Sequence, residues 1–171
     1  MTTVLAVDLG SASGRVLAGT LTDGRLDVTD IHRFKHEARR REDGTLTWDV
    51  ATMEAETITG LKKALEQFPD ARAVSIDTWG VDWAPLDENG ELVGDVIAYR
   101  DERTSRTLDA FRDRIGDREF FDLTGNQPAT INTANQLFAY LQENPRLRTA
   151  PSPRPVPARL LAYRLTGVVG L

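Results

Sequence analysis

The sequence predicts an α/β protein in which three consecutive strands precede the first helix. Three short runs rich in apolar and β-branched residues follow one another within the first 31 residues, separated by turns of small and polar residues. An amphipathic segment typical of a helix comes next, and a further strand-like run follows it directly. The order strand, strand, strand, helix, strand differs from the regular strand–helix alternation that builds an all-parallel sheet.

The expected strands are the apolar runs at residues 3–7, 16–21, 26–31, 73–77 and 81–86. Asp23 and Gly24 form a strong hairpin signal between the second and third of them, and residues 8–15 form the turn after the first. His32 and His36 are expected at the surface near the third strand. The first three runs therefore predict a meander of strands.

Helices are expected at residues 50–68, 105–115, 133–141 and 160–166. Asp49 precedes the first helix as an N-cap, because its side chain can accept a hydrogen bond from the first turn. Within that helix the apolar residues recur every three or four positions and share one face. Gly116 is expected to end the second helix and Gly167 the last.

The composition excludes several classes of function. The chain has 171 residues, which is enough for one domain with its own core. Its net charge of -5 and pI near 5.1 argue against nucleic-acid binding through a basic face. The lack of cysteine excludes disulfides and thiolate metal sites. No signal peptide and no apolar run near the roughly 20 residues that cross a bilayer are recognised, so no membrane partner is expected and a cytoplasmic location is the default.

The turn after the first strand has the composition of a phosphate-binding site. Gly14 and its small neighbours leave backbone N–H groups exposed, and such groups bind phosphate oxygens. Ser11 and Ser13 add hydroxyl donors, and Arg15 adds a charge-assisted donor worth about 1.5–3 kcal/mol. Asp8, at the end of the strand, can hold Mg²⁺ through water. The alternative is an edge hairpin that Asp8 caps; a Rossmann turn and a Walker loop are excluded, because a strand follows and the Gly-Lys-Ser/Thr sequence is missing.

A second cluster of acidic and aromatic residues surrounds Gly80 at the exit of a strand. Asp77 and Asp82 could accept hydrogen bonds from sugar hydroxyls, and Trp79 and Trp83 could pack on the C–H faces of a sugar ring. Gly80 would let a ligand approach the backbone closely. The alternative is a bulge between two strands with Trp79 in the core.

Two further segments have unusual composition. Residues 99–104 form a charged run, which in isolation indicates a solvated segment before a helix. Residues 146–158 are rich in proline and arginine and contain no acidic residue. The alternating prolines there exclude a helix or an inner strand.

Several segments together resemble the FGGY family of carbohydrate kinases, and in particular its rhamnulokinases. The most specific is the run Asp-Thr-Trp-Gly-Val-Asp at residues 77–82. The matching segments, in the family's order, are residues 6–16, 31–34, 47–49, 76–83, 98–104, 124–127, 132–133, 135–137 and 160–167. The resemblance covers almost the whole chain and implies the N-terminal lobe of an actin/hexokinase-like ATPase fold (ribonuclease H-like), with a mixed β-sheet and flanking helices.

The resemblance implies ATP-dependent phosphorylation of L-rhamnulose to L-rhamnulose 1-phosphate, with Mg²⁺ as cofactor. The residues that match the family's ATP loop are Ser11, Ala12, Ser13, Gly14 and Arg15. Gly80 matches a sugar-contacting position, with Trp79 and Asp82 beside it, and Asp8 is the candidate for the metal.

Residues 1–171 correspond only to the N-terminal domain of such a kinase. The resemblance implies that the general base, the adenosine pocket and a second phosphate loop belong to a C-terminal lobe, on which this domain normally packs. No catalytic residue is therefore expected in the chain, and the chain alone is expected to be inactive. Residues 146–158 replace an apolar run of the family, which suggests a locally shifted reading frame; translating the coding DNA in the other frames tests this.

Three functions stay open at this point. The first is an ATP-dependent kinase of L-rhamnulose. The second is a kinase of a different sugar or another ATPase of the same fold, although the aromatic cluster at residues 79–83 argues against a chaperone. The third is a non-catalytic remnant that binds sugar or phosphate.

Overall fold

The computed structural model describes residues 1–87, 89–145 and 160–168, which form two compact units. The first unit contains Met1–Ala38, Asp49–Gly80 and the C-terminal helix. The second contains Arg39–Trp48 and the described residues from 81 to 145. The expected Pro/Arg-rich segment at residues 146–158 lies outside the described residues. Within the described ranges, no helix is long and apolar enough to cross a membrane.

The first unit is built on a four-stranded mixed sheet. Its strands are β1 (Thr2–Leu9), β2 (Ser13–Thr22), β3 (Arg25–Lys35) and β6 (Val74–Thr78). The spatial order is β3-β2-β1-β6, with β1–β2 and β2–β3 antiparallel and β1–β6 parallel. The predicted meander is therefore confirmed, but β1 and β2 extend into residues 8–15, so the turn between them is shorter than expected.

Local sequence explains the turns and helix ends of this unit. Asp23 and Gly24 both have positive φ, 49° and 81°, as a tight hairpin between β2 and β3 requires. Asp49 is the N-cap of helix α1 (Val50–Gln67), and its side chain accepts a hydrogen bond from the Thr52 backbone N–H at 3.0 Å. Both predictions are confirmed.

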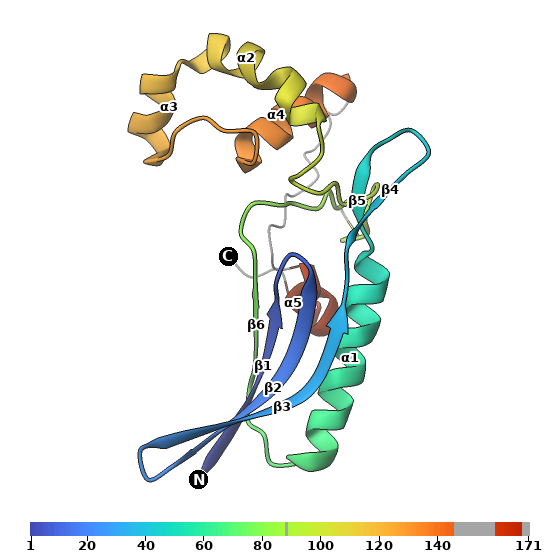
Figure 1. The fold of residues 1–171 in the computed structure, drawn as a ribbon, viewed down its shortest axis with the longest axis vertical. Helices are drawn as coiled ribbons and strands as arrows, with labels where there is room; N and C mark the ends of the chain where they lie inside the picture. Colours follow the sequence, from blue (N-terminus) through green and yellow to red (C-terminus); the bar gives the residue numbers. More distant parts are fainter. Residues whose placement is uncertain (88, 146–159, 169–171) are drawn as a thin grey trace. The chain divides into compact units, whose positions relative to one another are not determined.

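Helix α1 packs along the sheet, as Figure 1 shows. Alternate residues of the strands face it and are buried, because side chains of a strand point to opposite faces. The buried apolar residues of this unit are Leu5, Val7, Leu9, Val16, Ala18, Phe34, Met53, Ala64, Leu160 and Leu161. The last two belong to α5 (Leu160–Thr166), which ends at Gly167 as predicted and whose Arg164 pairs with Glu54 of α1.

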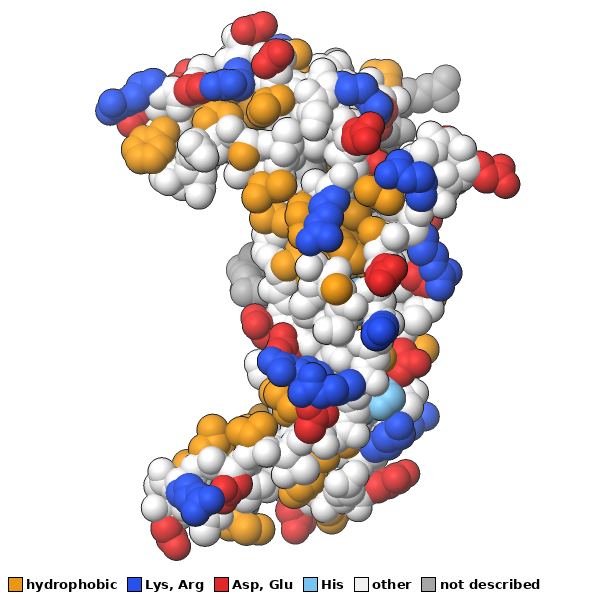
Figure 2. Space-filling view, in the orientation of Figure 1, with side chains coloured by type: hydrophobic (Ala, Val, Ile, Leu, Met, Phe, Trp, Pro, Cys, Tyr) orange, Lys and Arg blue, Asp and Glu red, His pale blue; other side chains and the backbone are white. Residues whose placement is uncertain are grey.

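Other apolar side chains of this sheet are exposed. They are Val4, Leu21, Leu26, Val28 and Val74. Figure 2 shows hydrophobic side chains gathered over the hairpin of β2 and β3. A monomeric domain seldom leaves several large apolar side chains of one sheet exposed together.

The second unit combines two short strands with three helices. Its elements are β4 (Ala38–Arg40), β5 (Leu46–Trp48), α2 (Arg103–Ile115), α3 (Asp117–Thr124) and α4 (Thr133–Glu143). Phe111 of α2 lies edge-on to Phe120 of α3 and Phe138 of α4, with ring centroids 5.5 and 5.6 Å apart. Helix α2 ends at Gly116 as predicted. Strands β4 and β5 and helix α3 were not predicted.

Three expectations are wrong. Residues 81–86 form no strand; Leu86 makes only an isolated bridge to Leu92. His36 is buried, with 6% of its surface exposed, because it continues the alternation of the buried Phe34 one residue beyond the end of β3. The charged run at residues 99–104 is not a solvated segment, because its members Asp101, Arg103 and Thr104 are buried.

Candidate functional site

The candidate phosphate turn lies between β1 and β2 in the first unit. Its backbone is closed by a hydrogen bond from the Gly10 N–H to the Ser13 carbonyl at 2.9 Å. Ala12 and Ser13 are exposed and Ser11 is half-buried, so this short turn is open to solvent. A tight turn of small residues between two strands can present backbone N–H groups to an anion.

A charged pair lies at the base of this turn. The strand register places Arg15 opposite Asp8, and Arg15 Nε donates to Asp8 Oδ2 at 2.7 Å, with Nη2 at 2.5 Å from the same oxygen. The parallel pairing of β1 with β6 places Asp77 beside Asp8. Side chains of residues in register on neighbouring strands point to the same face of a sheet. The carboxylates of Asp8 and Asp77 and the guanidinium of Arg15 therefore lie on one face.

The carboxylates of Asp8 and Asp77 are the groups that could hold the predicted Mg²⁺. Carboxylate oxygens are the ligands that Mg²⁺ prefers, and one or two of them with retained water suffice. Asp8 and Asp77, as register neighbours, fit such a site, although no cluster of three or more metal-binding side chains is found among the described residues. Asp8 therefore remains the candidate residue for the metal.

Gly14 is required by packing beneath the turn. It is buried, and a Cβ atom added to it would collide with the ring of Phe34 on the neighbouring strand β3. This contact explains the glycine without any ligand. Gly14 therefore supports the site by letting β2 and β3 approach each other closely.

His36, which the sequence placed at the surface, lies against this turn. Its backbone N–H donates to the Ala12 carbonyl at 3.2 Å. Its ring stacks on Trp79, with ring centroids 5.9 Å apart and planes inclined by 22°. Burial lowers the pKa of His36 below its ordinary value, and backbone hydrogen bonds with Gly10 and Ser13 oppose that shift. The alternation of His32, Phe34 and His36 was the sequence signal that could have placed His36 inside.

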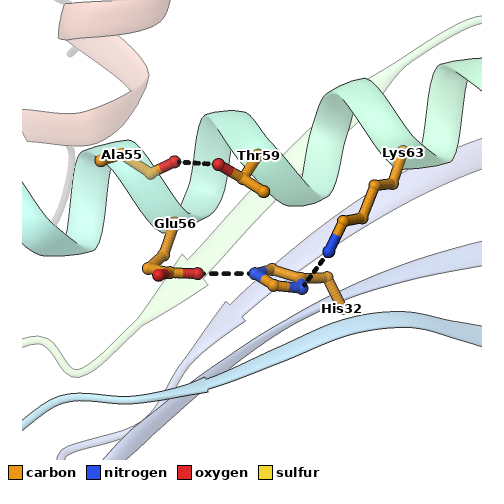
Figure 3. Close-up of polar contacts among 5 residues, drawn as sticks. All are labelled: His32, Ala55, Glu56, Thr59 and Lys63. Carbon is orange, nitrogen blue, oxygen red and sulfur yellow. Dashed lines mark hydrogen bonds and ion pairs between the residues drawn. The ribbon is translucent and has the colours of Figure 1, made fainter.

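His32 faces helix α1 instead. Its Nε2 lies 2.6 Å from Glu56 Oε2, and its Nδ1 lies 3.2 Å from Lys63 Nζ (Figure 3). A lysine ammonium can only donate, so Nδ1 accepts and Nε2 carries the proton that is donated to Glu56. Thr59 of the same helix donates to the Ala55 carbonyl at 2.8 Å. His32 therefore joins β3 to α1 and takes no part in the turn.

Gly80 follows β6 and Trp79, and nothing in the described structure requires a glycine there. A Cβ atom added at Gly80 would meet no heavy atom within 4 Å, and its φ is not in the left-handed region. Gly80 is exposed, and Trp79 is half-buried on His36. Unlike Gly14, Gly80 has open space beside its backbone.

Asp82 belongs to the second unit and is buried, with 5% of its surface exposed. Trp48 Nε1 donates to Asp82 Oδ2 at 2.6 Å. The preceding Val81 carbonyl accepts hydrogen bonds from Thr133 Oγ1 at 2.7 Å and Gln136 Nε2 at 3.0 Å. These contacts hold residues 81–82 firmly, and they explain why this segment joins no sheet.

Arg103 lies in the same unit with only 4% of its surface exposed. Burial lowers its pKa, while the negative charges of Glu143, Asp101 and Asp82 oppose the shift. Asp101 in turn accepts hydrogen bonds from the backbone N–H groups of Leu46 and Arg103, at 2.8 and 2.9 Å. The predicted charge run is thus a buried network that holds β5 and the start of α2.

The geometry of the first unit is that of a known family. The model of the N-terminal domain of the FGGY family of carbohydrate kinases matches residues 3–170, and the chain belongs to this family. The rhamnulokinase of Mannheimia succiniciproducens is 38% identical over 168 residues, which are 97% of this chain and 35% of that protein. The rhamnulokinase of Bacillus subtilis is 38% identical over 133 residues, 78% of this chain and 27% of that protein. The chain thus spans about a third of the length of the first of these curated relatives.

Solved structures of sugar kinases share the fold. The gluconate kinase of Lactobacillus acidophilus superposes with a TM-score of 0.77 at 14% identity, covering 97% of this chain and 33% of that one. The xylulose kinase of Bifidobacterium adolescentis gives 0.71 at 16% identity, covering 99% and 35%. These similarities confirm the predicted fold class, an actin/hexokinase-like ATPase lobe with a mixed sheet and flanking helices.

Proposed function

We propose that this chain is the N-terminal part of an ATP-dependent carbohydrate kinase that phosphorylates L-rhamnulose to L-rhamnulose 1-phosphate. The supporting observation is the hairpin turn at residues 10–13 with the Asp8–Arg15 pair at its base. The sugar assignment is supported by the two rhamnulokinases that are 38% identical to the chain. ATP, the implied phosphate donor, makes the cytoplasm the expected location.

On the nucleotide side, the backbone and hydroxyl groups of the turn would bind phosphate oxygens, and Arg15 would neutralise their charge. The residues proposed for this role are Ser11, Ala12, Ser13, Gly14 and Arg15. Mg²⁺ held by Asp8 would neutralise charge that develops on the transferred phosphoryl group. In this proposal Arg15 also keeps the Asp8 carboxylate oriented while the metal is absent.

On the sugar side, the proposed residues are Gly80, Trp79 and Asp82. The open space at Gly80 would let a sugar hydroxyl approach the backbone. The exposed part of Trp79 would cover an apolar face of the sugar, and Asp82, oriented by Trp48, would be its carboxylate. Removal of the hydroxyl proton would require a carboxylate base from the C-terminal lobe of such a kinase.

A chimera tests this function directly. The part of the Mannheimia succiniciproducens rhamnulokinase that aligns with this chain over 168 residues would be replaced by residues 1–171. We expect the chimera to phosphorylate L-rhamnulose with ATP and the 171-residue chain alone to show no turnover. Asp8→Ala in the chimera should abolish activity, whereas Asp27→Ala at the hairpin tip should not. A folded but inactive chimera, or turnover by the chain alone that Asp8→Ala removes, would contradict the proposal.

A further inference from the structure

His36 contacts two parts of the candidate site at once. It follows β3 directly, and its backbone N–H donates to the carbonyl of Ala12 in the middle of the turn. His36, which lies outside the β1–β2 hairpin, therefore holds the turn through this backbone hydrogen bond.

The same ring forms the support of Trp79. The two rings stack with centroids 5.9 Å apart, and the imidazole also lies beside Phe34, with ring centroids 6.0 Å apart. Phe34 in turn fills the space left by Gly14. A continuous set of contacts thus leads from the turn through His36 to Trp79, and all of it lies within the first unit.

We propose that His36 is a positioning residue that fixes the phosphate-binding turn relative to Trp79, so that a phosphate bound at the turn alters the environment of the sugar-facing indole. The inference rests on the proposed function for what the turn and Trp79 bind. It requires no contact between His36 and either substrate. His36 suits this role because its backbone N–H donates to the turn while its flat ring stacks on the indole.

Two variants test whether the stacked ring carries this link. His36→Gln loses the ring and His36→Phe keeps a flat ring, while both keep the backbone N–H that donates to Ala12. Amide hydrogen exchange of the 171-residue chain would report on residues 10–14, with 5-fluorotryptophan and ¹⁹F NMR reporting on Trp79, one of three tryptophans. The matched control is His32→Gln, which removes the other histidine together with its contacts with α1 and its own ring contact with Phe34.

We expect His36→Gln to raise the exchange rates of the turn amides about tenfold, because the aromatic contact that anchors His36 on Trp79 is lost, while His36→Phe and His32→Gln change them much less. Magnesium ATP should shift the Trp79 signal in the wild type and in His36→Phe, and His36→Gln should abolish that shift. Unchanged turn exchange in His36→Gln, or an equal increase in His32→Gln, would overturn the inference.

The two proposals fail differently. If magnesium ATP protects the turn in the wild type but the Trp79 shift survives in His36→Gln, the coupling through His36 is refuted and the proposed function stands. If magnesium ATP has no effect on the turn or on Trp79 of the lone domain, the ligand coupling is refuted, and the chimera decides the proposed function separately. Faster turn exchange in His36→Gln would then show only that His36 holds the hairpin.

Discussion

Arg15 and Asp8 face each other across the β1–β2 hairpin, with Arg15 Nε 2.7 Å from Asp8 Oδ2. Both side chains are partly exposed, at 43% and 35%, so the pair itself should contribute at most about 1 kcal/mol to folding. The pair lies at the base of the turn, where Asp8 is the register neighbour of Asp77, and the proposed function gives it a role in binding.

The first prediction concerns this pair. Arg15→Ala should weaken the binding of magnesium ATP about tenfold, because a charge-assisted hydrogen bond to phosphate is lost. The unfolding midpoint should change little. Arg25→Ala is the matched control, because Arg25 forms an exposed pair with Asp27 at the hairpin tip, 3.1 Å apart. Equal binding of magnesium ATP by both variants, measured by calorimetry, would argue against the assigned role.

Gly14→Ala should destabilise the chain by about 1–3 kcal/mol, because the added methyl group collides with the Phe34 ring. Urea unfolding followed by circular dichroism measures this loss. Adding Phe34→Leu should recover part of it, since the smaller side chain leaves room for the methyl group. A double variant less stable than the sum of both losses would be incompatible with the contact described.

Gly80→Ala should behave in the opposite way. The free energy of unfolding should stay within about 0.5 kcal/mol of the wild type, because open space surrounds the added methyl group. Binding of L-rhamnulose, followed through the fluorescence of the nearby Trp79, should weaken. If the variant binds the sugar as well as the wild type does, Gly80 is not a contact residue.

The stability of the chain should depend on pH through His36. Its pKa is lowered from 6.5 in the folded state, so the unfolded chain binds the proton more readily. The contribution to stability is therefore complete above 6.5 and is lost as the pH falls through the lower folded pKa. Carboxyl groups with lowered pKa, such as Asp87, act only near and below 3.8, outside this window.

Thermal unfolding at several pH values from about 8 to 5 measures this dependence. The wild type should lose stability on acidification, and His36→Gln should lose much less. The ring neighbours Phe34 and Trp79 do not titrate, so the difference between the two proteins isolates the histidine. Parallel curves for the two proteins would mean that His36 titrates with its ordinary pKa.

Local sequence predicted the hairpins and helix ends well. The Asp23–Gly24 turn and the Asp49 cap depend only on residues within a few positions of each other. The local sequence is therefore enough to predict both. The position of the turn between the first two strands was predicted for the same reason, although β1 continues to Leu9 and β2 begins at Ser13.

Contacts between distant residues could not be predicted in this way. The apolar run at residues 81–86 was expected to form a strand, but the side chains of Thr133 and Gln136, about 50 positions away, donate hydrogen bonds to the Val81 carbonyl. The burial of Arg103 depends on carboxylates from separate segments. His36 stands between Lys35 and Glu37, whose charges indicate a surface, while its burial depends on Trp79.

The most direct test of the account is a titration of the ¹⁵N-labelled chain, first with magnesium ATP and then with L-rhamnulose, followed by amide chemical shifts. We predict that the nucleotide shifts residues 10–15 and that the sugar shifts residues 79–82. In Arg15→Ala the first set of shifts should require about tenfold more nucleotide, and the second set should be unchanged. Shifts confined to other parts of the chain, or none at millimolar concentrations of both ligands, would contradict the assignment of this domain to sugar phosphorylation.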